Sequence, residues 1–251
     1  MADQEGGAIR IVPWAGPEGT AAAQAAAGTV REGAAAAART LRQAGIGVVL
    51  APVADVPSSP GAALAGRAYS ADPERAAAAV GEAVLGFRDG GVAPTVKHFP
   101  GLGAAQANTD DTAVTIPGTP ALGPFRAAIA AGVPLVMVAH ARYPALDPRR
   151  IASQSRRVVQ GLLREELGFR GVAITDSIEA AASLATGPVE RGAERAVRAG
   201  VDLVLTTGAG SALRVYRRLL ATARRSPAFA RRVRESAARV EALRRAAPGG
   251  G

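Results

Sequence analysis

Five apolar runs in this sequence are each followed by polar side chains that could do chemistry. The polar positions are Asp55, Lys97–His98, His140, Asp176 and Thr206–Thr207. Carboxylates and imidazoles can act as nucleophiles, acids or bases, and an amine beside them can bind a polar substrate. Because parallel sheets place their functional groups at the carboxyl ends of strands, these residues predict a site at that edge of a sheet.

Residue types that are scarce or absent narrow this chemistry. Cysteine is absent, which excludes disulfides, thiolate catalysis and cysteine-ligated zinc or iron–sulfur sites. The two histidines, His98 and His140, cannot form a three-histidine metal site, so we expect no metal and no cofactor. Lys97 is the single lysine, and its place at a buried strand end indicates a function. The alternative for KHFPGLG (97–103) is a surface turn with a chance Lys–His pair.

The elements that must position these residues alternate between short apolar strands and alanine-rich helices. Strands are predicted over residues 46–53, 92–96, 133–138, 172–175 and 201–206. Helices are predicted over 20–44, 73–89, 121–131, 154–167 and 189–199, with two more across 211–247 that break near Ser226. Several helices end in a glycine before the next strand, and the strands lack alternating polar residues. This repeat predicts a parallel sheet covered by helices.

The number of strand–helix units leaves two α/β architectures open. Five units are visible, whereas a closed (β/α)8 barrel needs eight and an open doubly wound sheet can use five. No GxGxxG pattern lies between a strand and a helix, so a nucleotide-binding sheet has no support. Since the composition shows no break, we expect one domain over residues 1–247 and a disordered tail at 248–251.

The formal net charge of +9 raises the question of a nucleic-acid partner. Nearly all basic residues are arginines, which is typical of GC-rich coding, and much of the excess lies at helical spacing from Arg214 to Arg245. The pattern favours a solvated helical face over a polyanion-binding face, so we expect no nucleic-acid partner. Without a signal peptide or an apolar run near the ~20 residues of a membrane span, we expect a cytoplasmic location and no membrane contact.

Seven fragments occur in an order typical of one enzyme family. They are DQEGG (3–7), APVADV (51–56), GRAYSADP (66–73), KHFPG (97–101), AHARYPALDP (139–148), LLREELGFRGVAITD (162–176) and AGVDLVL (199–205). Through them the chain resembles, over nearly its whole length, the N-terminal domain of glycoside hydrolase family 3, above all its bacterial β-N-acetylhexosaminidase branch. The resemblance implies an α/β fold of the (β/α)8 TIM-barrel type, incomplete, with about five of eight strand–helix units present.

The resemblance also implies an activity. It implies a retaining, exo-acting β-glycosidase that acts on a β-linked carbohydrate, possibly a cell-wall fragment, through a covalent glycosyl-enzyme intermediate. The family's nucleophile corresponds to Asp176, and a strand end would hold that carboxylate rigidly beneath the anomeric carbon. The alternative is that Asp176 only caps a helix beginning at Ser177.

Four further residues correspond to the family's sugar-binding groups: Asp3, Arg67, Lys97 and His98. One acid and three basic side chains offer the donors and acceptors that a polyol needs. Arg67 could instead pair with Asp72 in the same loop. His140 either binds the substrate or packs beneath the pocket, and the sequence leaves both roles open.

One loop departs from the hexosaminidase pattern. After KHFPG the family carries a mobile Asp-Ser-His loop, whose histidine is the general acid/base and whose aspartate orients it. Here Asn108 stands in place of the aspartate and Asp110 in place of the histidine. We expect Asp110 to be the acid/base, with Asp111 as the alternative. If neither serves, the alternative function is a catalytically impaired sugar-binding relative.

The start of the chain departs as well. Leu102 replaces a usual histidine, and Ile11 stands where an arginine is expected, with Arg10 one position early. DQEGG ends the family's third strand but begins at Asp3 here, so about two strand–helix units and the body of the third strand are expected to be missing. The exposed sheet edges that result would favour aggregation or pairing with a partner.

Overall fold

The computed structural model describes residues 1–246, and the chain forms two compact units. The first comprises Met1–Ala104, Pro120–Met137 and residues 244–246, and the second comprises Ala105–Thr119 and Val138–Leu243. Composition along the sequence gives no sign of this division, and a single domain over 1–247 stays a prediction. The predicted tail at 248–251 lies outside the described residues.

The first unit is built on parallel strands. β3 (Val48–Val49) pairs in parallel with β4 (Ala93–Phe99), and β5 (Leu135–Val138) follows β4 in the sheet order. Ahead of β3 in the sequence, β1 (Gln4–Gly6) and β2 (Ile9–Arg10) form a short antiparallel hairpin. The strand predicted over 46–53 is thus shorter than expected. At the end of the predicted strand, Val53 forms an isolated parallel bridge with Lys97.

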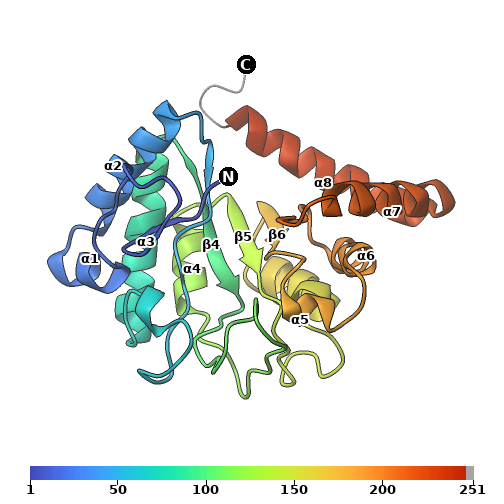
Figure 1. The fold of residues 1–251 in the computed structure, drawn as a ribbon, viewed down its shortest axis with the longest axis horizontal. Coiled ribbons are helices and arrows are strands. Elements are labelled where there is room, and N and C mark those ends of the chain that lie inside the picture. The colour runs from blue at the N-terminus through green and yellow to red at the C-terminus, as the bar shows by residue number, and fades with distance from the viewer. Residues whose placement is uncertain (247–251) are drawn as a thin grey trace. The chain divides into compact units, whose positions relative to one another are not determined.

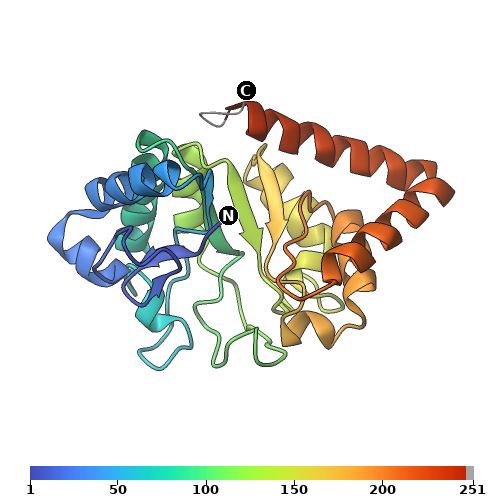
Figure 2. The same cartoon turned by 45° about the horizontal axis from the view of Figure 1, so that its top comes forward.

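Four helices belong to this unit: α1 (Ala21–Ala27), α2 (Val30–Gln43), α3 (Pro73–Asp89) and α4 (Gly123–Ala130). The predicted helix 20–44 is two helices because Gly28 ends α1 with φ +69°. Helices α2 and α3 lie side by side (Figures 1 and 2). Their contact depends on Gly86, where an added Cβ would lie 2.3 Å from the Arg31 carbonyl oxygen.

The second unit carries β6 (Val172–Thr175), whose Ile174 forms a parallel bridge with Leu203. The strand predicted over 201–206 is reduced to this bridge. The helix that the capping alternative for Asp176 would begin at Ser177 begins only at Ala181. The helical elements are η2 (Ala152–Gln154), the π-helix η3 (Arg157–Glu166), α5 (Ala181–Leu184), α6 (Val189–Ala199), α7 (Ser211–Arg225) and α8 (Pro227–Ala246).

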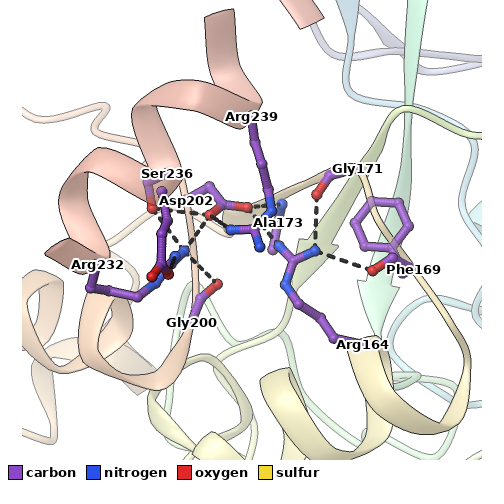
Figure 3. Close-up of polar contacts among 10 residues, drawn as sticks. Arg164, Phe169, Gly171, Ala173, Gly200, Asp202, Arg232, Ser236 and Arg239 are labelled. Atoms are coloured by element: carbon purple, nitrogen blue, oxygen red, sulfur yellow. Dashed lines mark hydrogen bonds and ion pairs between the residues drawn. The ribbon is translucent and has the colours of Figure 1, made fainter. Parts of the chain in front are cut away.

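Helix α8 is fastened to the rest of the second unit through the buried carboxylate of Asp202 (Figure 3). Its partners are Arg164, Arg232, Arg239, Ser236 and the backbone amide of Ala173. Helices α7 and α8 meet at Ser226, where the sequence predicts the break (Figure 2). No helix within residues 1–246 is both long and apolar enough to cross a membrane.

Candidate functional site

A buried cluster of charges gathers several predicted sugar-binding residues in the first unit. Lys97, at the end of β4, places its Nζ 2.6 Å from Asp3 Oδ1 and 2.6 Å from Glu5 Oε1. Arg67, in the 3-10 helix η1 (Ala65–Arg67), donates from Nε and Nη2 to the two oxygens of Glu5 at 2.9 and 2.7 Å. Asp72, the alternative partner of Arg67, caps α3 by accepting from two first-turn amides. Glu5 therefore joins the two cations.

The electrostatics of this cluster depend on Glu5, which is 7% exposed. Burial alone would raise the pKa of Glu5, but the charges and hydrogen bonds of Lys97 and Arg67 outweigh it and lower the pKa to about 2. Beside it, burial raises the pKa of Tyr69, and the negative charge of Glu5 raises it further. The glutamate is therefore ionised across the physiological range, and it holds both cations in place.

His98 is held by a second buried carboxylate, that of Asp55. Its Nδ1 lies 2.7 Å from Asp55 Oδ2, and the other carboxylate oxygen accepts from the Leu102 amide at 2.6 Å. Since a carboxylate only accepts, Nδ1 carries the hydrogen, and in the neutral ring Nε2 is then an acceptor. The peptide bonds Lys97–His98 and Phe99–Pro100 are cis. At position 102, where the family pattern has a histidine, the Leu102 backbone amide donates to Asp55 and so helps to hold its carboxylate.

In the second unit Asp176 is fixed at the end of β6. Its backbone amide donates to the Val138 carbonyl at 3.1 Å, and its Oδ1 accepts from the Ser177 amide at 2.8 Å. The side chain is half-buried. The alternative role as a helix N-cap is wrong in this structure, because the first residue of α5 is Ala181 and its N-cap residue is Ala180.

In the same unit, His140 contacts the backbone of Asp176. Its Nε2 lies 3.2 Å from the Asp176 carbonyl oxygen, and its Nδ1 lies 2.8 Å from Ser153 Oγ. The carbonyl only accepts, so Nε2 carries the hydrogen and Nδ1 accepts from Ser153. Burial lowers the pKa of His140, which keeps the ring neutral. Full burial favours the packing role for His140, and direct contact with a substrate stays a prediction that these contacts do not favour.

The loop from Ala105 to Thr119 presents the two candidate acid/base residues. Asp110 and Asp111 are both exposed. The Asn108 side chain donates to Asp110 Oδ2 at 3.3 Å and accepts from the Asp110 amide at 3.2 Å. The Asp110 carbonyl accepts from the Ala181 amide at 3.1 Å, which ties the loop to the start of α5. The negative charge of Asp110 acts on His140 and raises its pKa slightly against the larger effect of burial.

The predicted residues therefore form two groups. Asp3, Arg67 and Lys97 are brought together in the first unit with His98 next to Lys97 in the chain; Asp110, His140 and Asp176 belong to the second. Sequence reasoning named Asp55 as a polar strand-end residue but not as the partner of His98, and it missed Glu5 and Ser153 as supporting residues. Alternation along a strand could have identified Glu5, since a residue two positions from Asp3 points to the same side. Among residues 1–246 no cluster of histidine and acidic residues is arranged to hold a metal.

Comparisons with known proteins agree with this arrangement of elements. The family model described as "Glycosyl hydrolase family 3 N terminal domain" matches residues 1–243. A "Beta-hexosaminidase" of Stenotrophomonas maltophilia (strain K279a) is 40% identical over 174 residues, which are 67% of this chain and 51% of that protein. The chain thus spans about half the length of the curated relatives it matches.

Solved structures give the same result for the fold. A β-N-acetylhexosaminidase from Beutenbergia cavernae is 36% identical with a TM-score of 0.88, covering 96% of this chain and 76% of that one. A family 3 β-N-acetylglucosaminidase from Paenibacillus sp. is 35% identical with a TM-score of 0.90, covering 97% and 49%. The predicted resemblance and the TIM-barrel-type α/β fold are confirmed.

Proposed function

The chain belongs to glycosyl hydrolase family 3, and from that premise we propose that it is a retaining, exo-acting β-glycosidase of the β-N-acetylhexosaminidase kind. The observation that carries the proposal is Asp176, a half-buried carboxylate at the end of β6. Its amide, its carbonyl and one carboxylate oxygen are all held by neighbours. A retaining glycosidase needs such a fixed, ionised nucleophile beneath the sugar C1.

In the first step of the proposed reaction, Asp176 bonds to C1 while the bond from C1 to the glycosidic oxygen breaks. Asp110 gives its proton to that oxygen, and the aglycone leaves as an alcohol. In the second step Asp110, now a carboxylate, takes a proton from water, and the water oxygen displaces Asp176 from C1. Two displacements at C1 retain the β configuration.

The remaining predicted residues act on the sugar hydroxyls in this proposal. Asp3 supplies an acceptor, Lys97 and Arg67 supply charged donors, and His98 offers its Nε2. Glu5 and Asp55 keep these side chains in fixed positions. A substrate derived from cell-wall fragments and a cytoplasmic location remain proposals of the same kind.

The test is hydrolysis of 4-nitrophenyl N-acetyl-β-glucosaminide, with the first anomer released identified by NMR. We expect release of the β anomer and a loss of about 10⁴-fold or more in kcat for Asp176→Asn. Asp89→Asn is the matched control, because Asp89 is an exposed acid that pairs with Arg31, and neither residue belongs to the candidate site. Release of the α anomer, or unchanged turnover by Asp176→Asn, would contradict the proposal. Sugar binding without hydrolysis would indicate the impaired relative instead.

A further inference from the structure

The arginine-rich helix α8 has no part in the proposed reaction, yet its N-terminal half lines a cavity in the second unit together with α6 and the start of η3. The cavity has a volume of about 430 Å³ and is lined by Arg156, Arg198, Arg231 and Arg232, together with Phe229 and Glu235. We propose that this cavity binds a small phosphate-bearing ligand. The proposal is independent of the glycosidase reaction, because none of these residues belongs to the candidate active site.

Arg198 is fixed in the cavity wall from two sides. Its guanidinium carbon lies 4.8 Å from the centroid of the Phe229 ring, which is buried. Its Nη2 lies 2.8 Å from Glu194 Oε1, one turn earlier on α6. Stacking and pairing together restrict the rotamers of the side chain. A ligand that binds here therefore meets a donor that is already oriented.

The Arg232 side chain is held by more partners than that of Arg198, yet its Nε donor is left without one. Its Nη2 donates to Asp202, to Ser236 Oγ at 2.8 Å and to the Gly200 carbonyl at 3.3 Å, as Figure 3 shows. Its Nη1 lies 2.8 Å from Glu235 Oε2. The Nε atom is buried and has no hydrogen-bond partner among the described residues. A buried donor without a partner is costly, and a bound anion would supply the acceptor it lacks.

The charge balance of the cavity wall favours an anion. Four guanidinium groups face one carboxylate, Glu235, which is exposed and already paired with Arg232. The nearby acids do not remove the excess, because Glu194 also binds Arg218, and Asp202 also binds Arg164 and Arg239. Arg156 and Arg231 are exposed, so they can close on a ligand from solution.

The shape of the cavity favours a small ligand over a nucleic acid. A volume of about 430 Å³ lies in the usual range of small-molecule pockets, roughly 300–1,000 Å³. The single aromatic ring in the wall, Phe229, is covered by Arg198 and offers no face on which a base could stack. A phosphate group can accept two parallel hydrogen bonds from the planar guanidinium of an arginine. The first turn of α8 contributes Ala228 and Phe229 to the wall, and the positive end of the helix dipole there favours an anion.

The test is calorimetric titration of the whole chain with inorganic phosphate and with pyrophosphate at low ionic strength. The test variant is Arg156→Ala/Arg231→Ala, which removes the two exposed arginines of the cavity and leaves the buried network intact. The matched control is Arg157→Ala/Arg234→Ala, which removes the same charge from exposed arginines on the same two segments but outside the cavity. We expect the dissociation constant to rise at least tenfold in the test variant and less than threefold in the control.

Tighter binding of pyrophosphate than of phosphate would indicate a ligand with two phosphoryl groups. Equal loss of binding in the two double variants would contradict the proposal, since it would show an effect of surface charge alone. Absence of heat with both anions would contradict it as well. Binding of a single-stranded oligonucleotide with a steep salt dependence and no phosphate binding would show a polyanion-binding face instead of a small-ligand site. Thermal unfolding of each variant without ligand checks that the fold is kept.

Discussion

Glu5 shows how one residue can organise several others at this site. It is buried between Lys97 and Arg67 and accepts from both. Glu5 belongs to the DQEGG fragment, but the family resemblance assigns a sugar-binding role in that fragment to Asp3 and none to Glu5. Lys97 and His98 could be singled out from their types and their place after an apolar run, whereas Arg67 came only from the family resemblance. Their pairing with Glu5 and Asp55 could not be predicted, because it depends on segments that meet only in the folded chain.

Replacing Glu5 by glutamine should reduce the pH dependence of stability at acid pH. The pKa of Glu5 is about 2 in the folded protein against an ordinary value of 4.5, so its contribution is present above pH 4.5 and is lost as the pH falls toward 2. At 1.36 kcal/mol per unit, this contribution is about 3 kcal/mol. Urea unfolding at several pH values measures it.

Glu18→Gln is the control for that experiment, because Glu18 is an exposed acid in the same unit. We expect wild type and Glu18→Gln to lose stability in parallel between pH 4.5 and 2, and Glu5→Gln to lose about 3 kcal/mol less over that window. Equal slopes for all three proteins would contradict the ion-pair account of Glu5.

Asp110 and Asp111 form a natural pair of variants for assigning the acid/base. Asp110→Asn should lower kcat/KM by about 10²- to 10⁴-fold for a substrate with a poor leaving group, since that oxygen needs a proton to depart. The loss in kcat/KM should be small for a dinitrophenyl glycoside, because its leaving group departs without a proton. Asp111→Asn should stay near wild type with both substrates. The opposite ranking of the two variants would assign the role to Asp111.

At the scale of elements, local signals predicted the helices better than the strands. Helix α3 has its predicted bounds because Asp72 caps its first turn and Pro73 suits the first helical position. The strands at 46–53 and 201–206 are shorter than predicted. An apolar run indicates burial, but hydrogen bonding in a ladder requires a neighbouring strand in register, which the run itself does not encode.

Asp202 is the residue by which α8 is held, and Asp202→Asn tests that role. The change leaves Arg164, whose side chain is 6% exposed, without its charged partner. We expect a loss of about 3–5 kcal/mol in the free energy of unfolding, together with faster tryptic cleavage within α8. Glu235→Gln, on the exposed side of the same helix, should change both by little. Slow cleavage of Asp202→Asn would show that apolar packing alone holds α8.

For the whole molecule, the family and the fold class could be predicted from fragments spread over nearly the entire chain. The division into two compact units could not, because composition and helix spacing continue across it. Among the predicted site residues, Lys97 contacts Asp3 in the first unit and His140 contacts Asp176 in the second. The joint action of the two groups on one sugar belongs to the proposed function, and a covalent trap tests it directly.

The most direct measurement is mass spectrometry of the protein after incubation with a 5-fluoro glycosyl fluoride that keeps the 2-acetamido group. Fluorine at C5 slows both displacements, while the fluoride leaving group departs without an acid, so the covalent intermediate accumulates whichever residue is the acid/base. We predict one glycosyl group per chain, on the peptide that contains Asp176, and none on Asp176→Asn. A glycosyl group on another carboxylate, or turnover of the reagent with no labelled peptide, would contradict the assignment of Asp176 as the nucleophile.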